Sequence, residues 1–309
     1  MILPPPINSL KQELRYLIDQ IRFVAIKPKR CQRHVMNNLE TIDYILEHKC
    51  SISRYGDGEL DLAMAGKYGT PFNSGFQRFD AKLSQRLVDI LSYQNKVDNH
   101  LVCLPACSFS YGTSYLRKKA RGFWNQYTAH NINRFLDMTS PIETYGETNI
   151  SRFYLSHRDK SKCQNIIDRM KQIWDKRDIV IVEGNMTHLG YGNDLFDNAN
   201  SLQRILCPSM SAWDKYEVIL ETVLSKTNSN SLIIIALGMT ATVLAYDLAE
   251  NKRQALDIGH IDIEYEWMRM GVTEKVAVQG KFTNEAKDGN EVSNLYPDDF
   301  KKQILIDIS

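Results

Sequence analysis

Two unbroken apolar runs that end in glycine constrain the fold of this chain more than any other feature. Residues 178–184 (DIVIVEG) and 231–238 (SLIIIALG) are apolar throughout their centres. Short runs of this kind, without polar alternation, are typical of strands buried on both faces in parallel sheets. Helical patterns precede and follow both runs. The sequence therefore predicts an α/β fold, a Rossmann-like, doubly wound and mostly parallel sheet.

The rest of the chain continues this alternation. We expect further strands at 50–52, 101–104 and 254–258, and helices at 7–27, 33–48, 115–138, 159–176, 212–226 and 239–248. Nothing resembling a repeat or a flexible linker interrupts residues 49–309. We therefore predict an N-terminal helical extension over residues 1–48, beginning with a loose proline-rich segment, and one domain over residues 49–309.

Bulk properties exclude several classes of protein. The net charge is +1 over 309 residues, so no general attraction to nucleic acid is expected. The six cysteines include no Cys-x-x-Cys pair, which favours a reducing compartment. No apolar stretch approaches the roughly 20 residues that span a bilayer, and the first residues do not match a signal peptide. We expect a cytoplasmic protein.

The segment from residue 7 to 27 is amphipathic. Apolar residues recur at helical spacing, namely Leu10, Leu14, Leu17, Ile18, Ile21 and Val24, and basic residues lie around them. One interpretation is peripheral contact with an anionic membrane, at its inner face. The other is a helix that packs on the main domain or on a second copy in a homo-oligomer. The sequence leaves both open.

The first candidate site follows the strand expected at residues 50–52. Asp57 and Glu59 are separated by one residue, and in an extended backbone both would point to the same side. Their oxygens suit a hard cation such as Mn²⁺ or Mg²⁺. Gly56 permits close approach of a ligand, and Arg54 could pair with a phosphate. The alternative is a solvated Asp-Gly turn.

Two further strand ends add candidates for ligand binding. Gly238, Thr240 and Ala241 open a helix, whose N-terminus suits phosphate; alternatively Thr240 only caps that helix. Gly184 ends another strand, and the loop after it contains Asn193 and Asp194, which could hold a nucleoside or form a plain turn. Neither a dinucleotide-binding fingerprint nor a P-loop is present.

The fourth strand end is rich in acids. His260 precedes Asp262, Glu264 and Glu266, and in a helix that starts near Ile261 the first and last of these acids would share a face. A carboxylate that faces a cleft can take a proton from an attacking hydroxyl. The alternative is an acidic first turn favoured by the helix dipole.

Together these segments resemble a known family. The blocks SRYGDGE (53–59), VEG (182–184), GYGNDLF (190–196), ALGMTAT (236–242), LDIGHIDIEYEW (256–267) and GKFTNE (280–285) occur in this order. The set is similar to the GT-D-type glycosyltransferases, bacterial enzymes with a Rossmann-like fold. The resemblance covers about residues 45–286. Two positions depart from it, because family members often have Pro in place of Met239 and Ser-Arg in place of Thr187-His188.

The resemblance implies a metal-dependent transfer of a hexose, glucose or galactose, from a UDP-sugar to a hydroxyl of a growing glycan. That acceptor would be a polysaccharide, a lipid-linked oligosaccharide or a glycoprotein. Asp57 and Glu59 would serve the Mn²⁺ or Mg²⁺ site, and Glu266 would be the base, with His260 and Asp262 beside it. A base opposite the leaving group favours inversion.

Two alternatives use the same residues. A metal-dependent phosphohydrolase could act on nucleotide or sugar phosphates with the same acids and the same helix N-terminus. A non-catalytic sensor of nucleotides or glycans would need the binding groups but no base.

Overall fold

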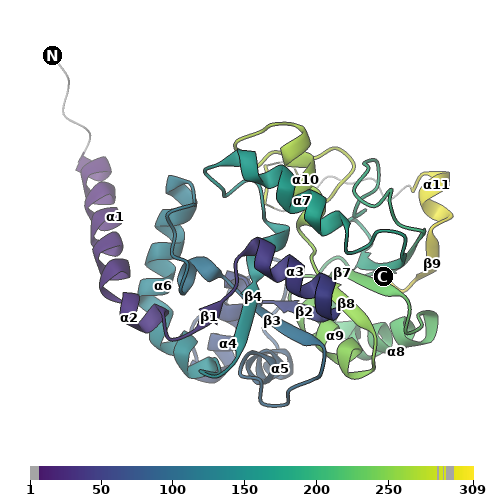
Figure 1. Cartoon of the computed structure of the whole chain (residues 1–309), viewed down its shortest axis with the longest axis horizontal. Coiled ribbons are helices and arrows are strands. Elements are labelled where there is room, and N and C mark those ends of the chain that lie inside the picture. Colours follow the sequence, from purple (N-terminus) through teal and green to yellow (C-terminus); the bar gives the residue numbers. More distant parts are fainter. Residues whose placement is uncertain (1–6, 284, 288, 290–295) are drawn as a thin grey trace.

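A single sheet of parallel strands organises the molecule. The computed structural model describes residues 7–283, 285–287, 289 and 296–309, with side chains from Glu13 onward. The proline-rich start and Asn284 of the GKFTNE block lie outside the described residues. The nine described strands follow the order β1-β4-β3-β2-β8-β7-β5-β6-β9, and every pairing is parallel. The predicted α/β, doubly wound fold is therefore confirmed (Figure 1).

The elements have the following bounds. The strands are β1 (His34–Val35), β2 (Ser51–Arg54), β3 (His100–Leu104), β4 (Thr144–Glu147), β5 (Asp178–Gly184), β6 (Ser201–Cys207), β7 (Leu232–Ala236), β8 (Gln254–Asp257) and β9 (Ile304–Asp307). The helices are α1 (Ile7–Ala25), α2 (Lys27–Arg30), α3 (Asn38–His48), α4 (Asp57–Tyr68), α5 (Ala81–Leu91), α6 (Lys118–Met138), α7 (Cys163–Lys171), α8 (Tyr216–Lys226), α9 (Met239–Glu250), α10 (Ile261–Arg269) and α11 (Asp298–Lys301).

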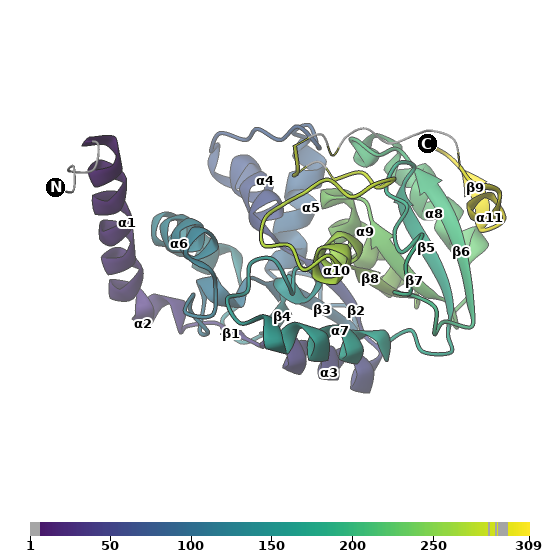
Figure 2. The ribbon, with the colours of Figure 1, turned by 90° about the horizontal axis from the view of Figure 1, so that it is seen from above.

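Helices cover both faces of the sheet, which explains the unbroken apolar runs. In β7, Ile233 and Ile235 join the core under α4, α5, α8 and α9, whereas Leu232 and Ile234 join the core under α3, α7 and α10. Successive side chains of a strand point to opposite faces, so a strand covered on both sides must be apolar at every position. Figure 2 shows α3 and α7 on one side of the sheet and α4, α5 and α9 on the other.

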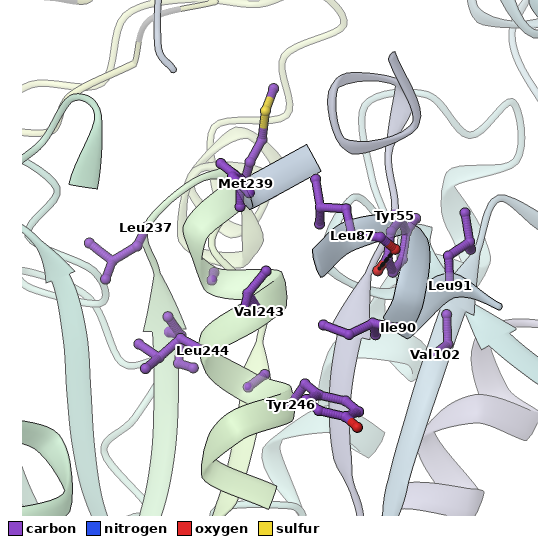
Figure 3. Packing of buried hydrophobic residues seen from close by; sticks show 14 of the residues in the cluster. Tyr55, Leu87, Ile90, Leu91, Val102, Leu237, Met239, Val243, Leu244 and Tyr246 are labelled. Carbon is purple, nitrogen blue, oxygen red and sulfur yellow. Dashed lines mark hydrogen bonds between the residues drawn. The ribbon is translucent and has the colours of Figure 1, made fainter. Parts of the chain in front are cut away.

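Helix α9 is the centre of the first of these cores. Its side chains Val243, Leu244 and Tyr246 are buried, and the first two are fully enclosed. Figure 3 shows Val243 and Tyr246 on the side of α9 that faces Ile90 of α5, whereas Leu244 points to the other side, toward Leu237. The terminal methyl of Met239, at the start of α9, lies against Gly58 of α4. This packing fixes where α9 begins.

The N-terminal segment divides into two parts. Helix α1 lies along α6 at one edge of the molecule, whereas β1 pairs with β4 and α3 packs on β4 and α7 (Figure 1). Helix α3 begins later than expected because Asn37 and Glu40 form a capping box, in which each side chain accepts from the other residue's backbone N–H. The division at residue 48 stays a prediction. In the part of the chain that the structure describes, no helix combines the length and apolarity needed to cross a bilayer.

Glu147 at the end of β4 makes stability depend on pH. Its side chain is 3% exposed and accepts from the backbone and side-chain nitrogens of Asn149, at 2.9 and 2.8 Å. Burial raises the pKa of Glu147 to about 7, from an ordinary value of 4.5. The folded chain therefore holds a proton that the unfolded chain releases between these values, and stability falls as pH rises through that window.

A Glu147→Gln variant should remove this dependence. Relative to the variant, the free energy of unfolding of the native protein should fall by about 3 kcal/mol between pH 5 and pH 8. Urea unfolding at the two pH values measures the difference. An offset between the two proteins that is the same at both pH values would contradict the assignment.

Candidate functional site

The strand order reverses between β2 and β8. From β2 the chain continues to β3 and β4 on one side, while β8, β7, β5 and β6 lie on the other. In open α/β sheets, ligands bind at such a reversal, beyond the carboxyl ends of the strands. A cavity of about 310 Å³ lies at this place. The residues that line it include Arg54, Gly56, Asp57, Gly58, Glu59, Ser74, Phe76, Arg152, Thr187, Gly238, Met239, Asp257, His260, Asp262 and Glu285.

Three helices begin at this cavity. The cavity is lined by residues 56–59 at the start of α4, by 238–239 at the start of α9, and by Gly259, His260 and Asp262 at the start of α10. These helices have 12, 12 and 9 residues. A helix N-terminus presents unpaired N–H groups and a partial positive charge. Three such ends at one cavity favour a strongly anionic ligand.

Arg54 is held rigidly beside these helix ends. Its Nη2 lies 3.2 Å from Oδ1 of Asp257, and its backbone N–H donates to Oδ2 of the same carboxylate at 3.1 Å. Its Nη1 also donates to the carbonyl of Thr148, and Thr242 donates to Asp257. Burial raises the pKa of Asp257, although Arg54 opposes that shift. The ion pair of Arg54 and Asp257 therefore holds a guanidinium between the carboxyl ends of the neighbouring strands β2 and β8.

A second guanidinium, Arg152, enters the cavity from the segment after β4. It donates to Nε2 of His260 at 2.6 Å and pairs with both carboxylate oxygens of Glu285. Burial, and then the charge of Arg152, lower the pKa of His260 to about 4. The ring is therefore neutral near pH 7, and its Nε2 accepts the hydrogen bond.

The two acids of the first candidate site are not arranged as expected. The expectation of an extended backbone at Asp57 and Glu59 is wrong, because α4 already begins at Asp57. Glu59 accepts from the backbone N–H of Gly56 at 2.8 Å and so caps the helix. Burial, with the nearby charge of Asp257, raises the pKa of Glu59 to about 7. Asp57 is exposed and is the more available carboxylate.

These acids fit a metal that is shared with a ligand. Among the described residues, no group of three His, Cys, Asp or Glu side chains could hold a metal alone. Mg²⁺ commonly binds one or two protein carboxylates and takes its other ligands from substrate phosphates and water. Of the charged side chains described at the cavity, Arg54, Arg152, Asp257, Asp262 and Glu285 are ion-paired, whereas Asp57 and Glu59 have no ionic partner and Glu59 is engaged as the cap of α4. Asp57 therefore fits as the main protein ligand, with Glu59 beside it.

The start of α9 is only partly open. Gly238 has φ +53°, a conformation that favours glycine, and a Cβ atom there would lie 2.4 Å from the ring of Phe76. Thr240 and Ala241 are buried and do not line the cavity. The hydroxyl of Thr240 has no hydrogen-bond partner among the described residues. Gly238, not Thr240, occupies the N-cap position.

Three other predicted binding residues, Gly184, Asn193 and Asp194, do not line the cavity. Gly184 packs closely against Ser209. The Asn193 amide donates to Asp262 at 2.7 Å and to Glu266 at 2.6 Å. Asp194 accepts from Lys171 and from the hydroxyl of Tyr265, at 2.9 and 2.8 Å. In the structure, Asn193 and Asp194 brace α10.

The acids of α10 separate into two environments. The helix starts at Ile261 as expected, and the shared contact with Asn193 confirms that Asp262 and Glu266 lie on one face. Asp262 lines the first cavity but is buried against Nζ of Lys281, at 2.6 and 2.7 Å. Glu266 lines a second cavity of about 620 Å³, together with Lys281 and His188.

Sequence reasoning missed several residues of the site. Arg152 follows β4, a strand of four residues that no apolar run announces. Asp257 was visible as an acid at the end of an apolar strand, which is a usable signal. Phe76 and Glu285 come from irregular segments, where no local pattern indicates proximity to the cavity.

The chain is similar to known proteins over most of its length. Residues 52–286 match the family described as glycosyltransferase GT-D fold. The chain is 36% identical over 285 residues to the probable glycosyl transferase Gly of Streptococcus gordonii, which covers 92% of this chain and 40% of that protein. It is also 38% identical over 269 residues to glycosyltransferase GlyD of Streptococcus pneumoniae serotype 4. That match covers 86% of this chain and 31% of that protein. The chain thus spans two fifths or less of these relatives.

Solved structures are similar to the chain over nine tenths or more of its length. One is described with the words "the highly conserved domain of unknown function 1792 has a distinct glycosyltransferase fold". It superposes on this chain with a TM-score of 0.84 and 35% identity, and the match covers 93% of this chain and 100% of that structure. Another is described as a new glycosyltransferase (DUF1792) from Streptococcus sanguinis, with a TM-score of 0.82, 36% identity, and coverage of 90% and 100%.

Proposed function

The chain belongs to the glycosyltransferase GT-D fold family, and from this premise we propose that it moves a hexose from a UDP-sugar to a hydroxyl of a growing glycan. The donor would be UDP-glucose or UDP-galactose. The acceptor would be a polysaccharide, a lipid-linked oligosaccharide or a glycoprotein.

The observation that carries the proposal is the convergence of three helix N-termini and two guanidinium groups on one cavity. A nucleoside diphosphate carries the concentrated negative charge that such an arrangement binds best. Arg54 and Arg152 would contact the diphosphate, with the start of α9 at Gly238 close by.

A divalent ion would complete this site. Asp57, with Glu59 beside it, would hold Mn²⁺ or Mg²⁺ against the diphosphate. When bound, such an ion neutralises the charge that develops on the leaving UDP. The neutral His260, fixed by Arg152 and Glu285, would orient the donor without adding charge.

The acceptor would enter from the second cavity. Glu266 is the carboxylate of α10 that lines it, so an acceptor hydroxyl bound there could give its proton to Glu266 while attacking the anomeric carbon. Asp262, on the same face one turn earlier, would hold Lys281 in place between the two cavities. Attack from the side opposite the leaving UDP would invert the anomeric configuration.

We also place the enzyme in the cytoplasm. All six cysteines are free and five are buried, which fits a reducing compartment.

Thermal unfolding with a panel of donors tests the proposal. UDP, UDP-glucose and UDP-galactose at 100 times their Kd should each raise Tm by about 4 °C with Mn²⁺ and not with EDTA. GDP-mannose and ADP-glucose serve as controls. Radiolabelled donor should then transfer its hexose to a glycan acceptor. Label released only as free sugar would favour the hydrolase alternative, and no metal-dependent response to UDP would contradict the donor assignment.

A further inference from the structure

Seven cations are concentrated in two short stretches of the sequence. Residues 117–121 (RKKAR) and 158–162 (RDKSK) contain all seven and a single acid, Asp159, whereas basic and acidic residues nearly balance over the whole chain, at 38 and 37. Among the residues that the structure describes, none of the seven forms an ion pair. We call them the basic patch: Arg117, Lys118, Lys119, Arg121, Arg158, Lys160 and Lys162.

The fold holds the two stretches side by side at the start of α6. The backbone N–H of Arg117 donates to the carbonyl of Ser156, and the N–H of Arg158 donates to the carbonyl of Tyr115, both at 2.9 Å. An antiparallel bridge joins the residues that lie between these two bonds. The basic patch is therefore built by a tertiary contact and is a fixed part of the fold.

The charge of the patch is oriented by the protein without being cancelled. Four of its members are exposed and three are half-buried. Among the half-buried ones, Arg117 donates to the carbonyl of Thr273, in the turn after α10, and Lys160 donates to the carbonyl of Leu155 at 3.2 Å. A carbonyl oxygen fixes a cation in place but carries no net charge. The patch thus presents a concentrated positive potential to its surroundings.

The shape of the surface indicates the kind of partner. None of the seven cations lines either cavity, so they do not enclose a small anion there. Two aromatic side chains beside the patch, Tyr111 and Phe123, are 54% and 45% exposed. Phe123 lies one turn after Lys119 on α6, and Tyr111 packs edge-on against Tyr115 with ring centroids 6.0 Å apart. Clusters of about four to eight cations bind anionic phospholipid headgroups, and aromatic rings favour the same interface.

We propose that the basic patch docks the protein on an anionic phospholipid bilayer. Each cation close to such a surface strengthens binding about fivefold, so the four exposed members support reversible contact. Because Arg117 contacts the turn after α10, a docked bilayer would lie beside the helix that carries Glu266. The patch is a different surface from the amphipathic segment 7–27, and the proposal does not depend on the proposed reaction.

Flotation with vesicles tests the docking. The native protein should float with vesicles of about one third phosphatidylglycerol in phosphatidylcholine and not with phosphatidylcholine alone. Salt at about 1 M, where the screening length is about 3 Å, should release it. Lys118→Gln, Lys119→Gln and Lys162→Gln in one variant should lower the partition coefficient about a hundredfold. A native protein that does not float would overturn the proposal.

The matched control removes three charges elsewhere. Lys49, Lys226 and Lys252 are exposed lysines that precede β2, β7 and β8, and changing all three to Gln should leave at least about a third of the native binding. Equal losses in the two triple variants would overturn the patch as the docking surface. Binding to soluble hyaluronate in place of vesicles would overturn the bilayer in favour of an anionic glycan.

Fluorescent labelling tests which side of the protein meets the bilayer. A Cys31→Ser background removes the one free cysteine that is exposed. A nitrobenzoxadiazole label at Ser114→Cys, beside the patch, should brighten and shift to the blue when vesicles bind, because the probe enters a less polar medium. The same label at Ser225→Cys, near the end of α8, should not respond; both serines are exposed. Equal responses at the two positions would overturn the assigned face.

Discussion

An Asp57→Asn variant should lose hexose transfer by about a thousandfold and keep its fold. Among the described residues, Asp57 and Glu59 are the cavity carboxylates without an ionic partner, and Glu59 caps α4, so Asp57 is the one free to neutralise a metal ion. Asparagine has nearly the same size but no charge, and a loss of about 4 kcal/mol of transition-state stabilisation corresponds to three decades in rate. Initial rates with radiolabelled UDP-hexose and Mn²⁺ measure the effect.

Asp61→Asn is the matched control for this variant. Asp61 lies one turn later on α4, accepts from the hydroxyl of Tyr127 at 2.8 Å and does not line the cavity. This variant should keep at least a third of the native rate. Both variants should unfold within a few degrees of the native protein. A rate for Asp57→Asn within tenfold of native would remove Asp57 from the metal site.

An Arg204→Met variant should lose about 3–5 kcal/mol of folding stability. Arg204 and Glu183 form an ion pair whose side chains are 1% and 0% exposed. Glu183 also accepts from the backbone N–H of Leu189, and Arg204 donates to its carbonyl at 3.0 Å. Removal of the cation leaves a buried carboxylate without its counter-charge, which is strongly destabilising. Urea unfolding gives the free energy directly.

Two further variants test the cause. Combining Arg204→Met with Glu183→Gln removes the stranded charge and should recover at least half of the loss. Arg78→Met breaks an exposed pair with Asp214, whose side chains are 78% and 52% exposed, and should cost less than about 1 kcal/mol. A double variant as unstable as Arg204→Met alone would show that packing, not charge, sets the effect.

The central strands could be predicted because burial on both faces removes polar residues from them. The strands toward the two ends of the sheet carry no such signal. β1 has two residues, β4 has four, and β6 contains the buried Arg204 in the middle of its pattern. A cation is acceptable there only because Glu183 of β5 lies beside it, and a one-dimensional sequence does not reveal that pairing. These strands were missed for this reason.

The candidate site, like the sheet, could be predicted only in part. Strand ends and helix starts are local signals, so the segments around Asp57, Gly238 and His260 were placed correctly at one cavity. The roles within each segment depend on three-dimensional neighbours. Glu59 caps its own helix, Asp262 is neutralised by Lys281, and Arg152 arrives from an unrecognised strand. Their functional roles stay predictions until the variants are measured.

The position of the cavity between β2 and β8 has a consequence for how the protein folds. Ile52 pairs with Leu256, so the two strands that carry Arg54 and Asp257 are separated by some two hundred residues of chain. Contacts between such distant residues require the closure of a very long loop and slow the search for the native topology. No short segment of this chain holds this cavity by itself. The binding cavity comes into existence only when the longest-range pairing of the sheet has formed.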